Sequence, residues 1–237
     1  MSIVLQKFIA DSGHCSRREA ERLIREGKVR INNRTAELGM RANPRDKVFI
    51  GKKKIFTKRE NLYIILNKPV DYVCTNRHFE DEKNIFDLIA LKERLFTVGR
   101  LDKNSRGLIL LTNDGNIAEK LTHPRYEHEK EYYVEVKKEN LNEEEIIRKF
   151  RKGVDIGEGD GYVRAKAIQY LGNNSFKIIL TEGKKRQIRR MFRACACEVS
   201  DLVRTRIGSG EGAIELGKLQ PGEWKFLEEK DVKKLLK

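Results

Sequence analysis

Residues 130–137, KEYYVEVK, are the stretch that most constrains the fold of this chain. Tyr132, Val134 and Val136 fall on one side of an extended backbone, and polar groups alternate with them. This period of two is typical of a strand with one buried face. Similar apolar runs bounded by turn residues occur at 62–69, 107–115, 162–171 and 175–183, and amphipathic stretches that predict helices occur at 116–124 and 142–153. The mixture predicts an α+β domain built on a largely antiparallel sheet.

Residues 1–59 differ from the rest of the chain in charge and in pattern. They hold 16 basic and 6 acidic residues, and so carry most of the net charge of +14. CSRREAERLIREGK predicts a helix with a capping box between Ser16 and Glu19 and a stop at Gly27. VLQKFIADSG predicts a shorter helix before it, and KVRIN and DKVFIG predict strands after it. We expect a linker near residues 56–60, which gives domains of 1–59 and 60–237.

Arginines gather on one face of the longer of these two helices. Few acidic residues are placed to pair with them, which favours binding to the phosphates of a nucleic acid. The competing interpretations are a solvated helix face and a basic protein that is merely soluble. The residues that we expect to contact RNA from this helix are Arg17, Arg18, Arg22 and Arg25.

A second basic segment, KKRQIRRMFRACACEV, spans residues 184–199. Taken as a helix, it places Ile188, Met191, Phe192 and Cys195 on one apolar stripe. A stripe of cations lies nearly opposite the apolar stripe. Several of these cations stand in the first turns of the helix, where the helix dipole disfavours positive charge. This placement indicates an anionic partner, although a solvated face is again the alternative. The cations are Arg186, Arg189, Arg190 and Arg193.

Several classes of protein are not expected from this sequence. The four cysteines are sparse, and Cys195 and Cys197 would face nearly opposite ways on a helix, so we expect no metal site. There is no phosphate loop of the GxxxxGK type and no GxSxG elbow. No run reaches the roughly 18 apolar residues of a membrane span, and the first residues lack the apolar core of a signal peptide. We therefore expect a cytoplasmic protein with no membrane partner.

Asp102 is the most conspicuous acidic residue, in VGRLDKNSRGLILLTNDG. It stands between Arg100 and Lys103, where a predicted strand meets a turn. Taken alone, it would most often be a surface ion pair. The pattern alone makes Tyr132 a core tyrosine more often than not, and Arg189 alone is one member of an exposed stripe.

The chain resembles a known family in several motifs together. SRREAERLIREGKVRINN resembles the small RNA-binding domain first seen in ribosomal protein S-four. GRLDKNSRGLILLTNDG, KEYYVEV and TEGKKRQIRRMF resemble, in order and spacing, motifs of the bacterial RsuA-like ribosomal-RNA pseudouridine synthases, and LNKP resembles a weaker one. The resemblance implies an S-four-type domain followed by a synthase domain with a mixed, mostly antiparallel sheet and flanking helices. It also implies a monomer that isomerises a uridine of ribosomal RNA without metal or cofactor, after the base leaves its stack.

The resemblance also assigns roles to residues of this chain. Asp102 matches the essential aspartate, and Arg189 is the residue that we expect to pair with it and to favour its charged form. Tyr132 matches a tyrosine that stacks on the target base and is a candidate for removing the proton from carbon 5. Arg100 matches a side chain that fills the gap left by the flipped base. The remaining expected RNA-contacting or loop-positioning residues are Lys103, Arg186, Gln187, Arg190 and Arg193.

Two departures from the family pattern concern the substrate and one turn. Asp71 stands where the family usually has glycine. If the turn needs a positive φ, an aspartate adopts that backbone conformation less easily than a glycine. KRQ, with HEKEY upstream, resembles the branch acting on a stem-loop of large-subunit 23S ribosomal RNA, one type of which also modifies a tRNA anticodon. The alternatives are the same chemistry on small-subunit RNA or tRNA, a non-catalytic RNA-binding or ribosome-assembly protein, and a tRNA synthetase fragment.

Overall fold

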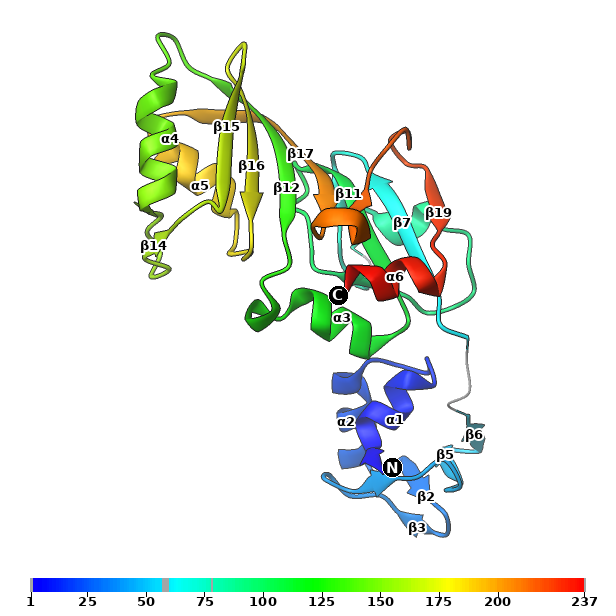
Figure 1. Ribbon diagram of the computed structural model, residues 1–237. Helices are drawn as coiled ribbons and strands as arrows, with labels where there is room; N and C mark the ends of the chain where they lie inside the picture. Colours follow the sequence, from blue (N-terminus) through cyan, green and yellow to red (C-terminus); the bar gives the residue numbers. More distant parts are fainter. Residues whose placement is uncertain (1, 57–59, 78, 237) are drawn as a thin grey trace. The chain divides into compact units, whose positions relative to one another are not determined.

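The computed structural model describes residues 2–56, 60–77 and 79–236. The chain forms two compact units (Figure 1). The first consists of Met1–Leu62 with the short segments Leu91–Leu95 and Asn113–Gly115, and the second consists of the other residues. Most of the expected linker, residues 57–59, lies outside the described residues.

The first unit packs two helices against short antiparallel strands. Its core is built from fully buried apolar side chains, among them Leu5, Ile9, Ala20 and Val29. The predicted helix pair and the two strands after it are confirmed. The helices are α1 (Leu5–Asp11) and α2 (Arg17–Arg25), and the strands are β1 (Ile3–Val4), β2 (Val29–Ile31), β3 (Arg34–Thr35), β4 (Arg41–Ala42), β5 (Val48–Ile50) and β6 (Lys53–Ile55).

Only half of the expected capping box forms at the start of α2. The Ser16 hydroxyl accepts a hydrogen bond from the backbone N–H of Glu19 at 3.1 Å, as the sequence predicts. The Glu19 carboxylate does not reach back to Ser16. It binds the guanidinium of Arg22, one turn further along the helix, because that cation lies at the i, i+3 position.

The second unit is built on one large sheet, which confirms the predicted α+β class. The main path of the sheet is β15-β16-β12-β17-β11-β7-β19, with β10 paired to β11 and β18 to β17. The β11–β17 pair is parallel and its other pairs are antiparallel. The strands are β7 (Tyr63–Lys68), β10 (Phe96–Val98), β11 (Arg106–Thr112), β12 (Lys130–Lys137), β15 (Ala167–Gly172), β16 (Ser175–Leu180), β17 (Glu198–Ile207), β18 (Ile214–Glu215) and β19 (Trp224–Phe226).

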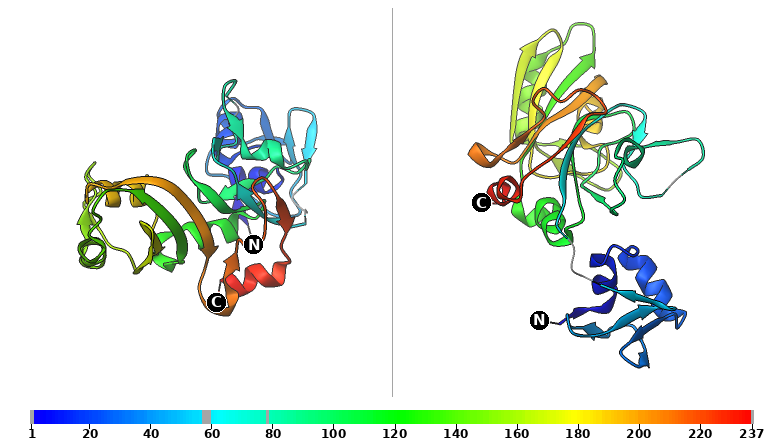
Figure 2. Two further views of the ribbon diagram at one scale, coloured as in Figure 1. Left: turned by 90° about the horizontal axis from the view of Figure 1, so that it is seen from above. Right: turned by 90° about the vertical axis from the view of Figure 1, so that its right-hand side faces the viewer.

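Helices cover the two halves of this sheet separately. Phe150, Phe176 and Phe192 pack their rings edge-on or tilted between α4, β16 and α5. Around β10, β11 and the end of β17, Leu121 and Leu235 bring α3 and α6 into a second apolar cluster. Figure 2 shows the long β12 and β17 curving along the sheet between these two halves. The helices are α3 (Gly115–Thr122), α4 (Glu143–Lys152), α5 (Gln187–Arg193) and α6 (Glu229–Leu235), with short 3-10 turns η1 (Ile85–Leu88), η2 (Pro124–Tyr126) and η3 (Gly210–Gly212).

Two small strand pairs complete the unit, and Gly107 allows a close approach between β11 and β17. The pairs β8 (Tyr72–Val73) with β9 (Lys83–Asn84) and β13 (Val154–Asp155) with β14 (Tyr162–Val163) lie outside the main sheet. Gly107 has φ +102°, and a Cβ there would lie 2.4 Å from the carbonyl oxygen of Arg204. Only glycine therefore lets β11 approach β17 this closely. No helix in the described ranges is long and apolar enough to cross a membrane.

The helix expected over residues 184–199 is much shorter than predicted. Arg186 has φ 51°, so α5 begins only at Gln187, and it ends at Arg193. Cys195 and Cys197 follow the helix and are both buried, which corrects the prediction that they lie on opposite faces of it. The apolar stripe is confirmed, because its four members, Ile188, Met191, Phe192 and Cys195, are all buried.

Candidate active site

Asp102 lies on the loop between β10 and β11. The backbone N–H of Ser105 donates to the carbonyl of Asp102 at 3.0 Å and closes a tight turn. Asp102 is half-buried, and its carboxylate makes no hydrogen bond or ion pair with the residues that the structure describes. The loop thus presents a carboxylate that the surrounding described residues leave unpaired.

Lys68, at the end of β7, anchors this loop from inside the protein. Its side chain is 0 % exposed. Its Nζ donates to the carbonyls of Ser105 at 2.7 Å, Lys103 at 3.1 Å and Pro69 at 2.8 Å. Burial lowers the pKa of Lys68 to about 8, and the negative charge of Asp102 is among the groups that oppose this shift. A buried cation therefore fixes the backbone on the carboxyl side of Asp102.

Asp71 supplies a second backbone contact to the loop. Its N–H donates to the carbonyl of Lys103 at 2.9 Å. Its φ is 68°, in the left-handed region. The turn therefore does need a positive φ, and Asp71 adopts it at some steric cost.

Arg189, on α5, holds the loop from another side. Its terminal nitrogens donate to the carbonyls of Asn104 at 2.6 Å and Val199 at 3.0 Å, which ties the loop to β17. Its Nε is buried and has no partner among the described groups. Burial, followed by the charge of Arg186, lowers the pKa of Arg189, and Asp102 opposes this. Within the described ranges no ion pair joins Arg189 to Asp102, so direct pairing stays a prediction.

Tyr132 lies on β12, opposite Arg204 of β17. It is 9 % exposed and shares its face with the buried Val134 and Val136, as the alternation predicts. The β12–β17 register shifts between Glu131 and Tyr132. Such bulges re-aim side chains and are frequent beside functional sites.

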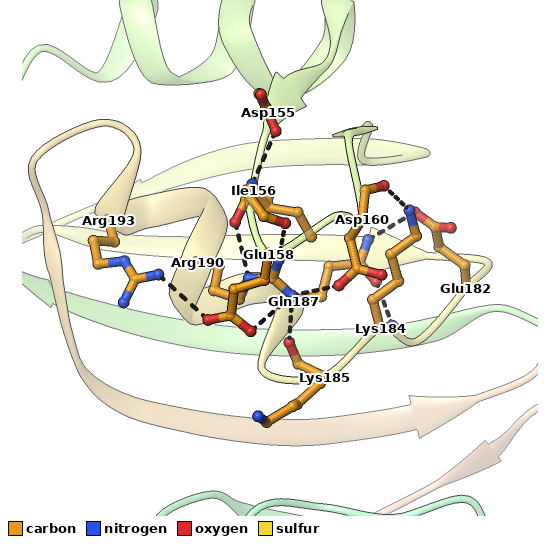
Figure 3. Close-up of polar contacts among 11 residues, drawn as sticks. Asp155, Ile156, Glu158, Asp160, Glu182, Lys184, Lys185, Gln187, Arg190 and Arg193 are labelled. Carbon is orange, nitrogen blue, oxygen red and sulfur yellow. Dashed lines mark hydrogen bonds and ion pairs between the residues drawn. The ribbon is translucent and has the colours of Figure 1, made fainter.

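Arg190 and Gln187 are held inside the protein (Figure 3). Arg190 is 4 % exposed. Its guanidinium donates to the Asp160 carboxylate at 2.6 Å, to the carbonyls of Ile156 at 2.9 Å and Lys185 at 3.1 Å, and to that of Gly157. The expected exposed stripe of arginines is therefore wrong at this position, because the turn at residues 157–161 folds over it.

Gln187 has a comparable local role. It is 4 % exposed, its amide donates to Glu182 at 2.9 Å, and its oxygen accepts from the backbone of Lys184 at 2.9 Å. For Gln187 and Arg190 these contacts favour loop positioning over phosphate contact. Both roles were compatible with the sequence.

Four other expected RNA-contacting residues of this unit are exposed. Lys103 lies 3.4 Å from Glu82, and Arg193 lies 4.0 Å from Glu158. Exposed pairs of this kind contribute little stability, so a phosphate can displace the acid at low cost. The four residues are Arg100, Lys103, Arg186 and Arg193.

In the first unit, Arg17, Arg18 and Arg25 are exposed on α2. Arg22 is exposed too, but it forms ion pairs with both Glu19 and Glu26. The expectation that these arginines lack acidic partners is therefore wrong for Arg22, because acids stand three before it and four after it.

The sequence interpretation missed several charged residues around this site, two of which, Lys68 and Arg204, are buried. Arg106 binds Asp201 through two hydrogen bonds of 3.0 and 2.6 Å, which join the start of β11 to β17. Lys68, Lys130 and Arg204 were also not singled out. The signal for Lys68 was a lysine inside the apolar run YIILNK, where an unpaired charge is costly. Arg204 stands likewise within a strand that the pattern did not identify.

Comparison with known proteins agrees with this architecture. Residues 62–194 match the family described as RNA pseudouridylate synthase, and residues 5–48 match the S4 domain. The chain is 42% identical to "Ribosomal large subunit pseudouridine synthase B" of Buchnera aphidicola, over 99% of this chain and 94% of that protein. It is 40% identical to "Dual-specificity RNA pseudouridine synthase RluF" of Escherichia coli K12, over 100% and 79%. A crystal structure of a pseudouridylate synthase superposes with a TM-score of 0.71 at 28% identity, covering 99% of this chain and 100% of that one.

The fold and the site thus define an RNA-modifying enzyme with an amino-terminal S4 domain. The chain belongs to the RNA pseudouridylate synthase family, and it is an isomerase that converts uridine in RNA to pseudouridine. The resemblance read from the sequence is confirmed.

Proposed function

We propose that this enzyme acts on a uridine of large-subunit ribosomal RNA, with Asp102 as its essential carboxylate. The observation that carries the assignment of Asp102 is its setting. It is a half-buried carboxylate that no described residue pairs with, on a loop whose backbone is held by Lys68, Asp71 and Arg189. The name of the Buchnera relative, a ribosomal large subunit pseudouridine synthase, supports the substrate class, and the name of the Escherichia coli relative supports RNA as the substrate.

The isomerisation exchanges one bond for another. The bond from N1 of uracil to C1′ of the ribose breaks, the base rotates, C5 bonds to C1′, the C5 proton leaves and N1 gains a proton. Asp102 promotes the cleavage, by attack on the sugar or the base or by removing a sugar proton. Preorganised groups accelerate such steps because they need no rearrangement during the reaction.

The other site residues act around Asp102. When RNA binds, Arg189 gives up a hydrogen bond to a backbone carbonyl and pairs with the Asp102 carboxylate instead. Tyr132 stacks on the target base and accepts the C5 proton. Arg100 fills the gap that the flipped base leaves in the RNA helix. Exposed Lys103, Arg186 and Arg193 bind phosphates. Buried Gln187 and Arg190 shape the loop.

The S4 domain supplies affinity. We assign it residues 1–59, with the catalytic domain at 60–237, and its Arg17, Arg18, Arg22 and Arg25 bind the phosphates of an RNA stem-loop. We propose that the enzyme works as a monomer in the cytoplasm, where its RNA is found. No metal or cofactor takes part in this scheme.

Tritium release from RNA labelled at carbon 5 of uridine tests the substrate class. Large-subunit ribosomal RNA, small-subunit ribosomal RNA and bulk tRNA are offered separately to the full-length protein. We expect release from large-subunit RNA. Release only from small-subunit RNA or only from tRNA would refute the proposed substrate, and release from both large-subunit RNA and tRNA would extend it.

A further inference from the structure

Three residues of adjacent strands share one face of the sheet. Lys130 and Tyr132 are two apart on β12, so their side chains point to the same face. Arg204 of β17 is the register partner of Tyr132, and paired residues of neighbouring strands share a face. Two cations therefore flank the tyrosine that we assign to the target base.

Arg204 is a buried arginine without the partners that burial normally requires. It is 2 % exposed. Its Nε donates to the carbonyl of Leu108 at 2.7 Å, and one terminal nitrogen is buried with no partner in the described part of the chain. It forms no ion pair with any described carboxylate. An arginine buried without such partners destabilises the folded state unless something compensates its charge.

Arg190 provides the comparison within the same unit. It is equally buried, at 4 % exposed, yet all three of its guanidinium nitrogens are bonded and one of them binds the Asp160 carboxylate. This is how the chain builds an arginine whose role is structural. Arg204 lacks the carboxylate and part of the hydrogen bonding.

Lys130 adds a second positive charge next to Arg204. Its Nζ donates to the carbonyl of His128 at 3.1 Å and forms no ion pair with a described acid. Burial and the charge of Arg204 lower the pKa of Lys130 to about 8, and Glu182 opposes this shift. The side chain of Glu182 is itself bonded to Gln187. Two cations that repel each other in a partly dehydrated setting are stabilised when an anion lies beside both of them.

We propose that Lys130 and Arg204 form an anion site beside Tyr132 that binds an oxyanion of the target nucleotide. This inference rests on the proposed function of Asp102 and Tyr132. The oxyanion has two sources on the same RNA: the phosphodiester next to the target uridine, and the uracil ring. When the N1–C1′ bond breaks, its electron pair stays on the ring, and the charge spreads to the ring oxygens until C5 bonds to C1′.

The two sources predict different kinetics. A phosphate is charged before and after bond cleavage, so losing its contact weakens RNA affinity and leaves the saturated rate unchanged. The uracil charge exists only after cleavage, so losing its contact lowers the saturated rate and leaves affinity unchanged. Either result supports the anion site, and whether affinity or the saturated rate falls identifies its ligand.

The test uses Lys130→Met and Arg204→Met in the full-length protein, with Arg204→Lys as the conservative variant. Lys137→Met is the matched control, because Lys137 is an exposed lysine on the opposite face of β12. Each protein is measured for RNA affinity, for single-turnover tritium release at saturating RNA, and for Tm. The RNA is the class that the wild-type enzyme modifies, or large-subunit RNA if it modifies none.

We expect a loss of tenfold or more in affinity or in saturated rate for both methionine variants. Lys137→Met should stay within twofold of wild type, Arg204→Lys should recover part of the loss, and Tm should not fall for Lys130→Met. Affinity and rate that stay within twofold in both methionine variants would overturn the proposal. So would losses no larger than the unfolded fraction given by a lower Tm. If the wild-type protein releases no tritium, the proposed function fails and the uracil source fails with it. The affinity measurements then decide the remaining source, the phosphate, and unchanged affinity in both methionine variants overturns the anion site.

Discussion

Replacement of Lys68 by methionine should change how stability depends on pH. In the folded protein burial lowers the pKa of Lys68 from 10.5 to about 8. The unfolded chain therefore binds more protons than the folded chain between those two values. Stability then rises with pH across this window, because deprotonation relieves the cost of the buried ammonium.

The magnitude follows from the size of the shift. Each pKa unit corresponds to about 1.4 kcal/mol, so Lys68 contributes a rise of at most roughly 3 kcal/mol between pH 8 and pH 10.5. The three carbonyls that accept from its Nζ favour the ammonium, which makes this figure an upper limit. At pH 7 the Lys68→Met protein lacks three hydrogen bonds of about 1.5 kcal/mol each, but it also avoids the cost of burying an ammonium. The net effect is a destabilisation of roughly 1–2 kcal/mol.

The assay is urea unfolding of wild type and Lys68→Met at pH 7, 8, 9 and 10. The free-energy difference between them should widen by about 2–3 kcal/mol from pH 8 to pH 10. The exposed Lys137→Met control should follow the wild-type profile, since the shift at Lys130 is common to all three proteins. Parallel profiles for wild type and Lys68→Met would refute the account of a strained buried ammonium.

Three further predictions concern other parts of the chain. Asp71→Gly should stabilise the protein by about 0.5–1 kcal/mol in urea unfolding, because glycine adopts φ 68° without steric cost; a destabilised variant would show that the aspartate side chain is needed. Arg190→Met should destabilise the protein by roughly 2 kcal/mol in urea unfolding, because the carbonyl of buried Ile156 loses its donor and the other guanidinium hydrogen bonds are lost; a change under about 0.5 kcal/mol would contradict this. Deleting residues 1–59 should weaken RNA binding and flatten its salt dependence, measured by anisotropy at several salt concentrations; an unchanged slope would show that the domain does not bind phosphate.

Local patterns in the sequence predict much of this fold. The alternation around Tyr132 identifies β12, and the stripe ending at Cys195 identifies the buried side of the 187–195 segment. Both signals are repeats of apolar residues whose spacing is set by the geometry of one strand or one helix. The central strand β17 has no such signal, because its polar residues Asp201 and Arg204 are placed by neighbouring strands.

The site was harder to predict than the fold. Motif resemblance selects Asp102, but the groups that hold its loop come from elements far apart in the chain. Lys68 and Arg189 both bind backbone carbonyls, which leave no side-chain signature in a sequence. Arg190 differs from its exposed neighbours only because a turn some thirty residues earlier folds over it.

The most direct test of the central claim is tritium release by Asp102→Asn beside wild type and Asp81→Asn, an exposed aspartate of the same unit. The substitution keeps the shape of the side chain and removes its charge. We expect wild type and Asp81→Asn to form pseudouridine at similar rates, and Asp102→Asn to bind the same RNA with no detectable release. Pseudouridine formed by Asp102→Asn at a rate near that of wild type would contradict the assignment of Asp102 as the essential carboxylate.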